Sequence, residues 1–151
     1  MGNMISMNDR NRKFLIFSLQ DSLYALNLAE VAEVADLPMM SPIPLAPEYY
    51  AGVFSFHGDI VAAMKLSLFL GLTECRQPGK IVVLRQEEAS LAFLVDSIIR
   101  IVSEDEISFS APPDSGFSAS TLTFFACAAI QLDLKKLICK AESGMQAVNR
   151  G

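Results

Sequence analysis

His57 is the only histidine in the 151-residue chain, so it is the first residue to consider for acid–base chemistry. A nucleophilic mechanism would require a serine or cysteine beside it and an acid to orient the imidazole, and the chain contains no Gly-x-Ser-x-Gly motif. His57 stands at the polar tip His57-Gly58-Asp59 of segment 50–64, with apolar residues on both sides. This position favours a turn or packing role for His57 over a catalytic one.

Other residue types that carry chemistry are equally isolated. Cys75, Cys127 and Cys139 lack the short recurring spacing of a metal site, and we expect each to be a small, reduced, buried residue. The acidic cluster 104–106 is expected to begin a short helix, where its negative charge interacts favourably with the helix dipole. There is no phosphate-binding Gly-x-Gly-x-x-Gly or Walker sequence. We therefore predict no catalytic residue, no cofactor, no metal and no enzymatic activity.

The composition narrows the possible partners. The formal net charge of −5 argues against nucleic acid, because phosphate binding requires a basic surface. Hydrophobic residues make up 52% of the chain, yet the longest uninterrupted apolar run, 124–130, is too short to cross a bilayer. The surplus of apolar residues must be buried or must form a surface that a partner covers. The first twelve residues are polar, so we expect a flexible tail over 1–12, no secretory signal and a cytoplasmic protein.

Short apolar runs separated by turn residues predict three β-hairpins. These hairpins cover 14–26, 50–64 and 80–96. In the second hairpin, Gly52 and Gly58 can take the positive φ that a bulge or a turn requires. Segment 28–34 suits a helical turn followed by a strand, but its periodicity does not decide between helix and strand.

The remaining segments are also short. Four prolines within 38–47 exclude a helix and a central strand and predict an extended loop. Further predictions, in chain order, are a short helix over 66–71, a strand over 98–102, a long loop over 108–123, a strand over 125–132, a short helix over 133–138 with Asp133 as its N-cap, and a flexible tail over 141–151. The fold class is therefore mainly β, as a sandwich or barrel. The strands fall into two groups, before and after the polar loop 73–79, which suggests two small barrels sharing one hydrophobic core.

The order of these segments resembles that of the CheW family, the chemotaxis coupling proteins, over residues 13–140. No single motif is distinctive, but the order and spacing of the motifs together are. The matching stretches are Phe14-Leu15-Ile16-Phe17-Ser18-Leu19, Tyr24-Ala25-Leu26 with Val31-Ala32-Glu33-Val34, Ile43-Pro44 with Pro47, Tyr50-Ala51-Gly52-Val53, His57-Gly58-Asp59-Ile60-Val61, Leu94-Val95-Asp96 with Ile101, and Leu132-Asp133-Leu134-Lys135-Lys136-Leu137.

The resemblance implies a CheW-like fold of two intertwined, five-stranded SH3-like barrels around a shared core. It implies a non-enzymatic adaptor that links the regulatory domain of a CheA-type histidine kinase to the cytoplasmic tip of methyl-accepting receptors. The kinase would pair barrel to barrel, and the helical receptor tip would lie in a groove between the barrels. Neither nucleic-acid binding nor membrane insertion is expected.

The resemblance also implies which residues face the partners. The predicted interface residues are Val31, Glu33, Val34, Ser55 and His57. At the hairpin turn, Ser55 stands where the family has Asn, and His57 stands where it has Arg. Glu33 is therefore expected to face a histidine in place of the family's arginine. Segment 108–124 also lacks the family's Gly-containing strand. Two alternatives remain open: service in another pathway, such as pilus-driven motility, or a small-molecule sensor that reuses the fold with His57 as its polar centre.

Overall fold

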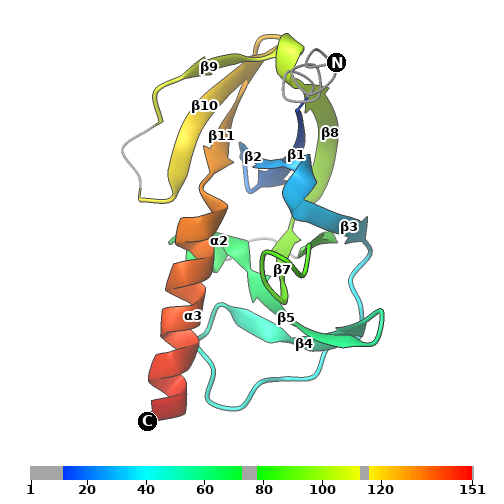
Figure 1. Cartoon of the computed structure of the whole chain (residues 1–151), viewed down its shortest axis with the longest axis vertical. Coiled ribbons are helices and arrows are strands. Elements are labelled where there is room, and N and C mark those ends of the chain that lie inside the picture. Colours follow the sequence, from blue (N-terminus) through cyan, green and yellow to red (C-terminus); the bar gives the residue numbers. More distant parts are fainter. Residues whose placement is uncertain (1–11, 73–77, 113–115, 151) are drawn as a thin grey trace, which may run out of the picture.

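The chain folds into two β-sheets with a long C-terminal helix beside them (Figure 1). The computed structural model describes residues 12–72, 78–112 and 116–150, with side chains of the last helix described as far as Ser143. The upper sheet has the strand order β8-β1-β2-β11-β10-β9. Its strands are β1 (Lys13–Leu19), β2 (Ser22–Asn27), β8 (Ser97–Ser103), β9 (Ser108–Ser110), β10 (Ser118–Phe124) and β11 (Cys127–Leu132).

The lower sheet has five strands in the order β3-β6-β7-β5-β4. Its strands are β3 (Val31–Ala35), β4 (Tyr50–Phe56), β5 (Asp59–Lys65), β6 (Lys80–Leu84) and β7 (Leu91–Val95). The three predicted hairpins are confirmed as β1–β2, β4–β5 and β6–β7. The mainly β class with two subdomains is confirmed too, although the upper sheet has a sixth short strand, β9, and neither sheet pairs its two end strands into a closed barrel among the described residues.

The two sheets do not correspond to the two halves of the chain, so the division at loop 73–79 was wrong. The upper sheet joins the first two strands to the last four, through a parallel pairing of β2 with β11 in which Tyr24 lies opposite Ile130. A second parallel pairing, β5 with β7, organises the lower sheet. Periodicity along the chain identifies strands, but it carries no information about which distant strands pair.

Three short helices connect the strands, and one long helix lies beside the sheets. They are η1 (Leu28–Glu30), α2 (Leu66–Phe69), η2 (Glu104–Glu106) and α3 (Leu134–Arg150). Segment 28–34 is thus a helical turn followed by strand β3, and the acidic cluster forms η2, where Ser103 and Glu106 make a capping box. Asp133 caps α3 by accepting a hydrogen bond from the backbone N–H of Lys136 at 3.2 Å.

Two segments predicted as irregular are regular. The helix α3 continues through the predicted tail to Arg150, because the apolar spacing of Leu134, Leu137 and Ala141, all buried, continues in the sequence beyond Lys140. The predicted loop 108–123 is replaced in large part by strands β9 and β10, so the prediction of a long loop is wrong; neither strand contains a glycine. Small polar residues disguise β10, but Leu122 and Phe124 alternate into the core as in any half-buried strand.

The two sheets share one hydrophobic core, as predicted. Phe17 of β1, Phe93 of β7 and Leu137 of α3 belong to the same cluster and are fully buried. Smaller clusters lie within each sheet, around Phe14 in the upper one and around Phe54 in the lower one. The lower sheet is therefore held in a fixed position relative to the upper one and to α3.

Three further predictions concern the N-terminal tail, the cysteines and membrane insertion. The predicted tail lies outside the described residues except for Arg12, whose guanidinium pairs with the carboxylate of Glu104 at 2.5 Å. Cys127 and Cys139 are exposed, which corrects the expectation of buried thiols, and Cys75 lies outside the described residues. In the described part of the chain, no helix has both the length and the apolar character needed to span a membrane.

Tyr50 ties α3 to the lower sheet, and the buried tyrosines should make the fold sensitive to alkali. The hydroxyl of Tyr50 donates to the carbonyl of Ala141 at 3.2 Å. Burial, with smaller effects of Tyr49 and Glu142, raises the pKa of Tyr50 to about 12, and burial also raises the pKa of Tyr24 and that of Tyr49.

We therefore expect the folded protein to show little phenolate absorbance near pH 10, where the tyrosines of the unfolded chain ionise. The folded-state pKa of Tyr50 is the higher one, so its contribution to stability is complete below about pH 10 and is lost as the pH rises through about 12. Absorbance at alkaline pH with and without urea measures both effects. Full phenolate absorbance at pH 10 in the folded protein would contradict the expectation.

Candidate functional site

The turn between β4 and β5 presents His57 to solvent. His57 and Gly58 have φ of 50° and 85°, and Phe56 pairs with Asp59 across the turn. Positive φ at both central residues is the type I′ geometry that matches the twist of a two-residue hairpin. Histidine adopts this region more readily than most residues. The imidazole, with its side chain 75% exposed, therefore projects from a rigid turn.

Glu33 of β3 faces this turn. His57 Nε2 lies 3.8 Å from Glu33 Oε1, so the structure brings together two residues that are far apart in the sequence. The two strands are at opposite ends of the lower sheet's strand order, and their approach shows that the sheet curls strongly. Both side chains are largely exposed, so the pair contributes little to folding stability.

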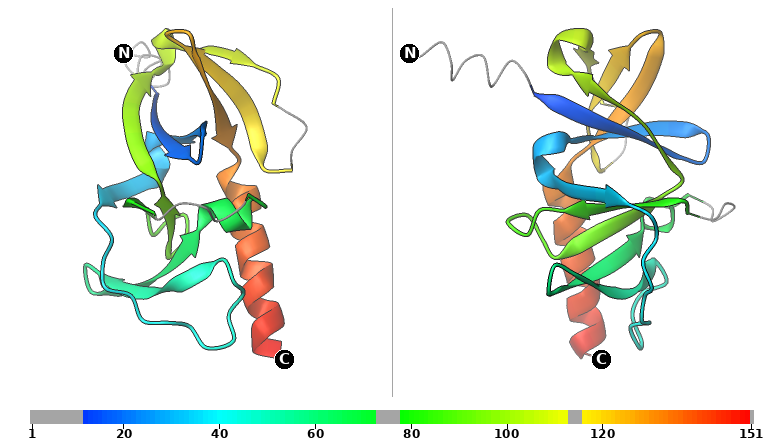
Figure 2. Two further views of the ribbon diagram at one scale, coloured as in Figure 1. Left: turned by 180° about the vertical axis from the view of Figure 1, so that it is seen from behind. Right: turned by 90° about the vertical axis from the view of Figure 1, so that its right-hand side faces the viewer.

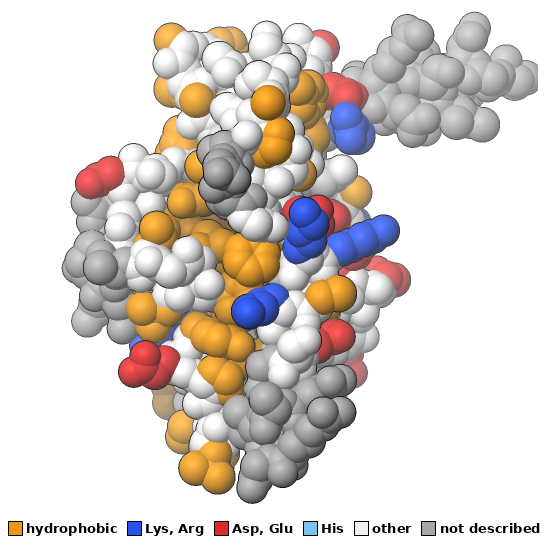
Figure 3. Space-filling model, turned by 90° about the vertical axis from the view of Figure 1, so that its left-hand side faces the viewer, with side chains coloured by type: hydrophobic (Ala, Val, Ile, Leu, Met, Phe, Trp, Pro, Cys, Tyr) orange, Lys and Arg blue, Asp and Glu red, His pale blue; other side chains and the backbone are white. Residues whose placement is uncertain are grey.

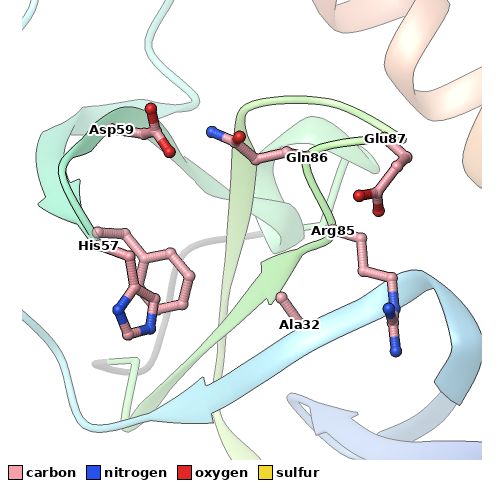
Figure 4. Close-up of a pocket in the computed structure, with 7 residues that line it drawn as sticks. Ala32, His57, Asp59, Arg85, Gln86 and Glu87 are labelled. Carbon is pink, nitrogen blue, oxygen red and sulfur yellow. The ribbon is translucent and has the colours of Figure 1, made fainter.

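A shallow hollow of about 360 Å³ lies beside His57, between β3, the β4–β5 turn and the β6–β7 turn (Figure 4). The ring of Phe56 packs edge-on against the imidazole, with ring centroids 4.2 Å apart. Arg85 stands across the hollow from His57, and its backbone N–H donates to the carbonyl of Glu30 at 3.0 Å. The lining residues are Ala32, Phe56, His57, Asp59, Arg85, Gln86 and Glu87. Charges of both signs thus surround a small apolar floor.

The five predicted interface residues are not equally placed to meet a partner. Glu33, Ser55 and His57 are exposed, and Val34 is half-buried. Val31 is only 7% exposed and belongs to the shared core, so it presents almost no side-chain surface. It supports the strand that carries Glu33 instead.

Sequence reasoning missed the apolar side chains that lie next to these residues. Ile60 is 66% exposed and lies opposite Ser55 in the register of β4 and β5, hence on the same face. The proline-rich loop runs antiparallel beside the other edge of β4, where Ser41 pairs with Val53. This loop exposes Met39 at 96% and Leu45 at 90%. A signal was present, since Ile60 directly follows the polar turn and Met39 lies among prolines.

The residues around His57 form an open, exposed surface. Within the described residues, no group of three or more His, Cys, Asp or Glu side chains is arranged to hold a metal ion. His57 lies against the carboxylate of Glu33 and the ring of Phe56. We define the adaptor face as the exposed side chains of this region. They are Glu33, Met39, Ser55, His57 and Ile60.

The comparisons with known proteins all point to the same family of domains. A family model described as the CheW-like domain matches residues 13–140. The chain is 26% identical over 115 residues to the chemotaxis protein CheW of Treponema pallidum, covering 72% of this chain and 68% of that protein. It is 24% identical over 110 residues to the chemotaxis protein CheW of Rhizobium meliloti, covering 72% and 71%.

One relative is much longer than the matched region. The chain is 28% identical over 115 residues to the chemotaxis protein CheV3 of Helicobacter pylori, covering 71% of this chain but only 36% of that protein. Among solved structures, the scaffolding protein TtCheW of Thermoanaerobacter tengcongensis superposes with a TM-score of 0.73 at 22% identity. The superposition covers 84% of this chain and 92% of that one. At this identity the match establishes the fold.

Proposed function

Because the chain belongs to the family of CheW-like domains, we propose that it is a non-enzymatic adaptor of chemotaxis-type signalling in the cytoplasm. In this proposal it couples the regulatory domain of a CheA-type histidine kinase to the cytoplasmic tip of methyl-accepting receptors. The names of the relatives, chemotaxis proteins in three organisms, support the pathway. They also favour chemotaxis over pilus-driven motility.

The observation that carries the proposal is the apolar exposure on the adaptor face. Ile60 and Met39 are 66% and 96% exposed on either side of strand β4, which is anchored in a buried core. Large apolar side chains exposed on a sheet and on the loop that pairs with its edge are typical of a surface that a partner covers. We assign this apolar part to the kinase domain, which would pack against β4 and β5.

The charged part of the adaptor face suits the receptor. Glu33 and His57 present opposite charges when the imidazole is protonated, and Ser55 adds a hydroxyl beside them. Polar groups of this kind orient a partner more than they add affinity. Val34 is half-buried next to Glu33 and would contribute apolar contact.

Calorimetry with two purified partners tests the proposal. We expect saturable, independent binding of the kinase regulatory domain and of a receptor-tip fragment from the same genome, and a ternary complex when both are present. Failure of every kinase regulatory domain from that genome to bind would refute the adaptor role.

Removing the imidazole should affect coupling more than folding. We expect His57→Ala to weaken receptor binding about fivefold, while the free energy of unfolding changes by only about 0.5 kcal/mol, because the side chain is exposed. His57→Asn is the matched control, since asparagine accepts the positive φ of this turn. If His57→Asn restored full receptor binding, the turn rather than the imidazole would be the determinant. A large loss of thermal stability in His57→Ala would contradict the assignment.

The alternative of a small-molecule sensor finds no support at His57. Small-molecule sites enclose most of their ligand, whereas this imidazole is 75% exposed. The hollow beside it is rimmed by charges of both signs, with Arg85 and Glu87 among its lining residues.

A further inference from the structure

A basic surface lies on the first turns of α3, in a protein whose overall charge is −5. Residues 134–141 contain three lysines and no acidic residue. Among the described residues, Lys135, Lys136 and Lys140 form no ion pair with a carboxylate. Of the three, Lys135 acts electrostatically on Glu30, which leaves Lys136 and Lys140 as the two more available cations.

These lysines border a second hollow, of about 430 Å³, between α3 and the segment that precedes β10. Its lining residues are Gly116, Phe117, Lys135, Lys136, Cys139, Lys140 and Ser143. Figure 3 shows this side of the molecule, with hydrophobic side chains at its centre and Lys and Arg side chains beside them.

Phe117 is the aromatic residue that lines this hollow, and a row of aromatic rings supports it from behind. The ring of Phe117 lies 5.4 Å from that of Phe69, which in turn lies 4.8 Å from that of Tyr49. All three pack against the shared core but remain partly exposed. The hollow therefore has a fixed shape, and a side chain entering it would find aromatic contact beside two ammonium groups.

This surface is distinct from the adaptor face. In Figure 1 the helix α3 and the tip of the β4–β5 hairpin lie on opposite sides of the lower sheet, and Figure 2 shows the same separation from behind. A ligand at α3 would thus leave Ile60 and His57 accessible.

We propose that the hollow beside Phe117, Lys136 and Lys140 is a docking site for an acidic peptide segment that carries a large apolar side chain. The apolar residue enters against Phe117, and flanking carboxylates pair with the two lysines, which are one helical turn apart. A short peptide is favoured over an anionic membrane, because a peptide faces only the lysines at the hollow, whereas an extended anionic surface also faces the rest of a protein whose net charge is −5. The site is independent of the proposed coupling of kinase and receptor.

Selection from a random peptide library displayed on phage tests the proposal with the full chain as bait. We expect the enriched peptides to combine Asp or Glu with Phe, Leu, Ile or Met. Synthetic copies should bind the wild type in fluorescence anisotropy and bind K136E/K140E about tenfold more weakly, because two attractions become repulsions. Binding should also weaken as salt increases. K13E/R100E is the matched control, since it changes the net charge equally at the upper sheet and should retain binding.

Three results would overturn the proposal. They are enrichment of peptides without acidic residues, equal binding to K136E/K140E and to wild type, and binding to phosphatidylserine vesicles that K136E/K140E abolishes while no peptide binds. If K136E/K140E failed to fold, K136Q/K140Q would serve in its place, with a smaller expected loss. A Phe117→Ser variant separates the apolar contact from the charge, and it should weaken peptide binding without changing the salt dependence.

Discussion

Replacing Gly52 by alanine is expected to destabilise the protein by about 3 kcal/mol, since two separate penalties fall on one residue. Gly52 has a φ of +153°, a conformation that side chains of L-residues rarely adopt. A Cβ atom there would lie 2.5 Å from the carbonyl oxygen of Ser41. That oxygen accepts the N–H of Val53 at 2.7 Å, and the N–H of Ser41 donates back to Val53 at 2.8 Å. Alanine would thus push the proline-rich loop away from β4.

Substitutions at two other glycines separate the cost of the positive φ from the cost of the steric clash. Gly58 has a φ of +85° with no atom near its Cβ position, so Gly58→Ala should cost only about 1 kcal/mol from backbone strain. Gly116 has open space around its Cβ position, so Gly116→Ala should change stability little. Urea unfolding of the three variants gives the order directly. A Gly52→Ala protein as stable as Gly58→Ala would show that the loop yields without cost.

Ile60→Asp is expected to weaken binding of the kinase regulatory domain about thirtyfold, which corresponds to the loss of one central apolar contact. Ile60 is 66% exposed on β5, opposite Ser55, in the part of the adaptor face that we assign to the kinase. The substitution places a charge at the centre of an interface that must exclude water. Because the side chain is already exposed, the free energy of unfolding should change little.

Ile99→Asp provides the matched control for Ile60→Asp. Ile99 is 46% exposed on β8 of the upper sheet, so the same substitution removes a similar apolar side chain and adds the same charge. Calorimetry should show unchanged kinase binding for Ile99→Asp. Equal loss in both variants would mean that net charge governs binding, and no loss in Ile60→Asp would place the kinase elsewhere.

The local parts of the fold were predictable because short-range chemistry encodes them. The turn His57-Gly58, the proline-rich loop and the cap at Asp133 each depend on neighbours in the sequence, and each is found where expected. Strand β10 was missed because Ser118, Ser120 and Thr121 resemble loop composition, although Leu122 and Phe124 are buried. Its partner β11 supplies the hydrogen bonds that make these residues a strand. Tertiary context therefore overrode composition.

The candidate site was predictable in part, through the resemblance to a family. Glu33 and His57 were expected near each other and lie 3.8 Å apart. Val31 was expected at the interface through the family resemblance, yet it is buried in the core, because a matching motif does not show which way a side chain faces. The exposure of Ile60 depends on which face of β5 the core covers. That face is known only once the pairing of β5 with β7 is known, and the sequence does not give this pairing.

The parallel pairing of β2 with β11 determines when the protein can complete its fold during synthesis. Strands β3 to β7 lie within residues 31–95, so the lower sheet has all of its strands once that segment has left the ribosome. Strand β2, by contrast, keeps one edge unpaired until its partner β11 (Cys127–Leu132) has left the ribosome. A nascent chain therefore exposes this edge for most of its translation, and a message truncated before Cys127 would yield a product prone to aggregation rather than a weaker adaptor.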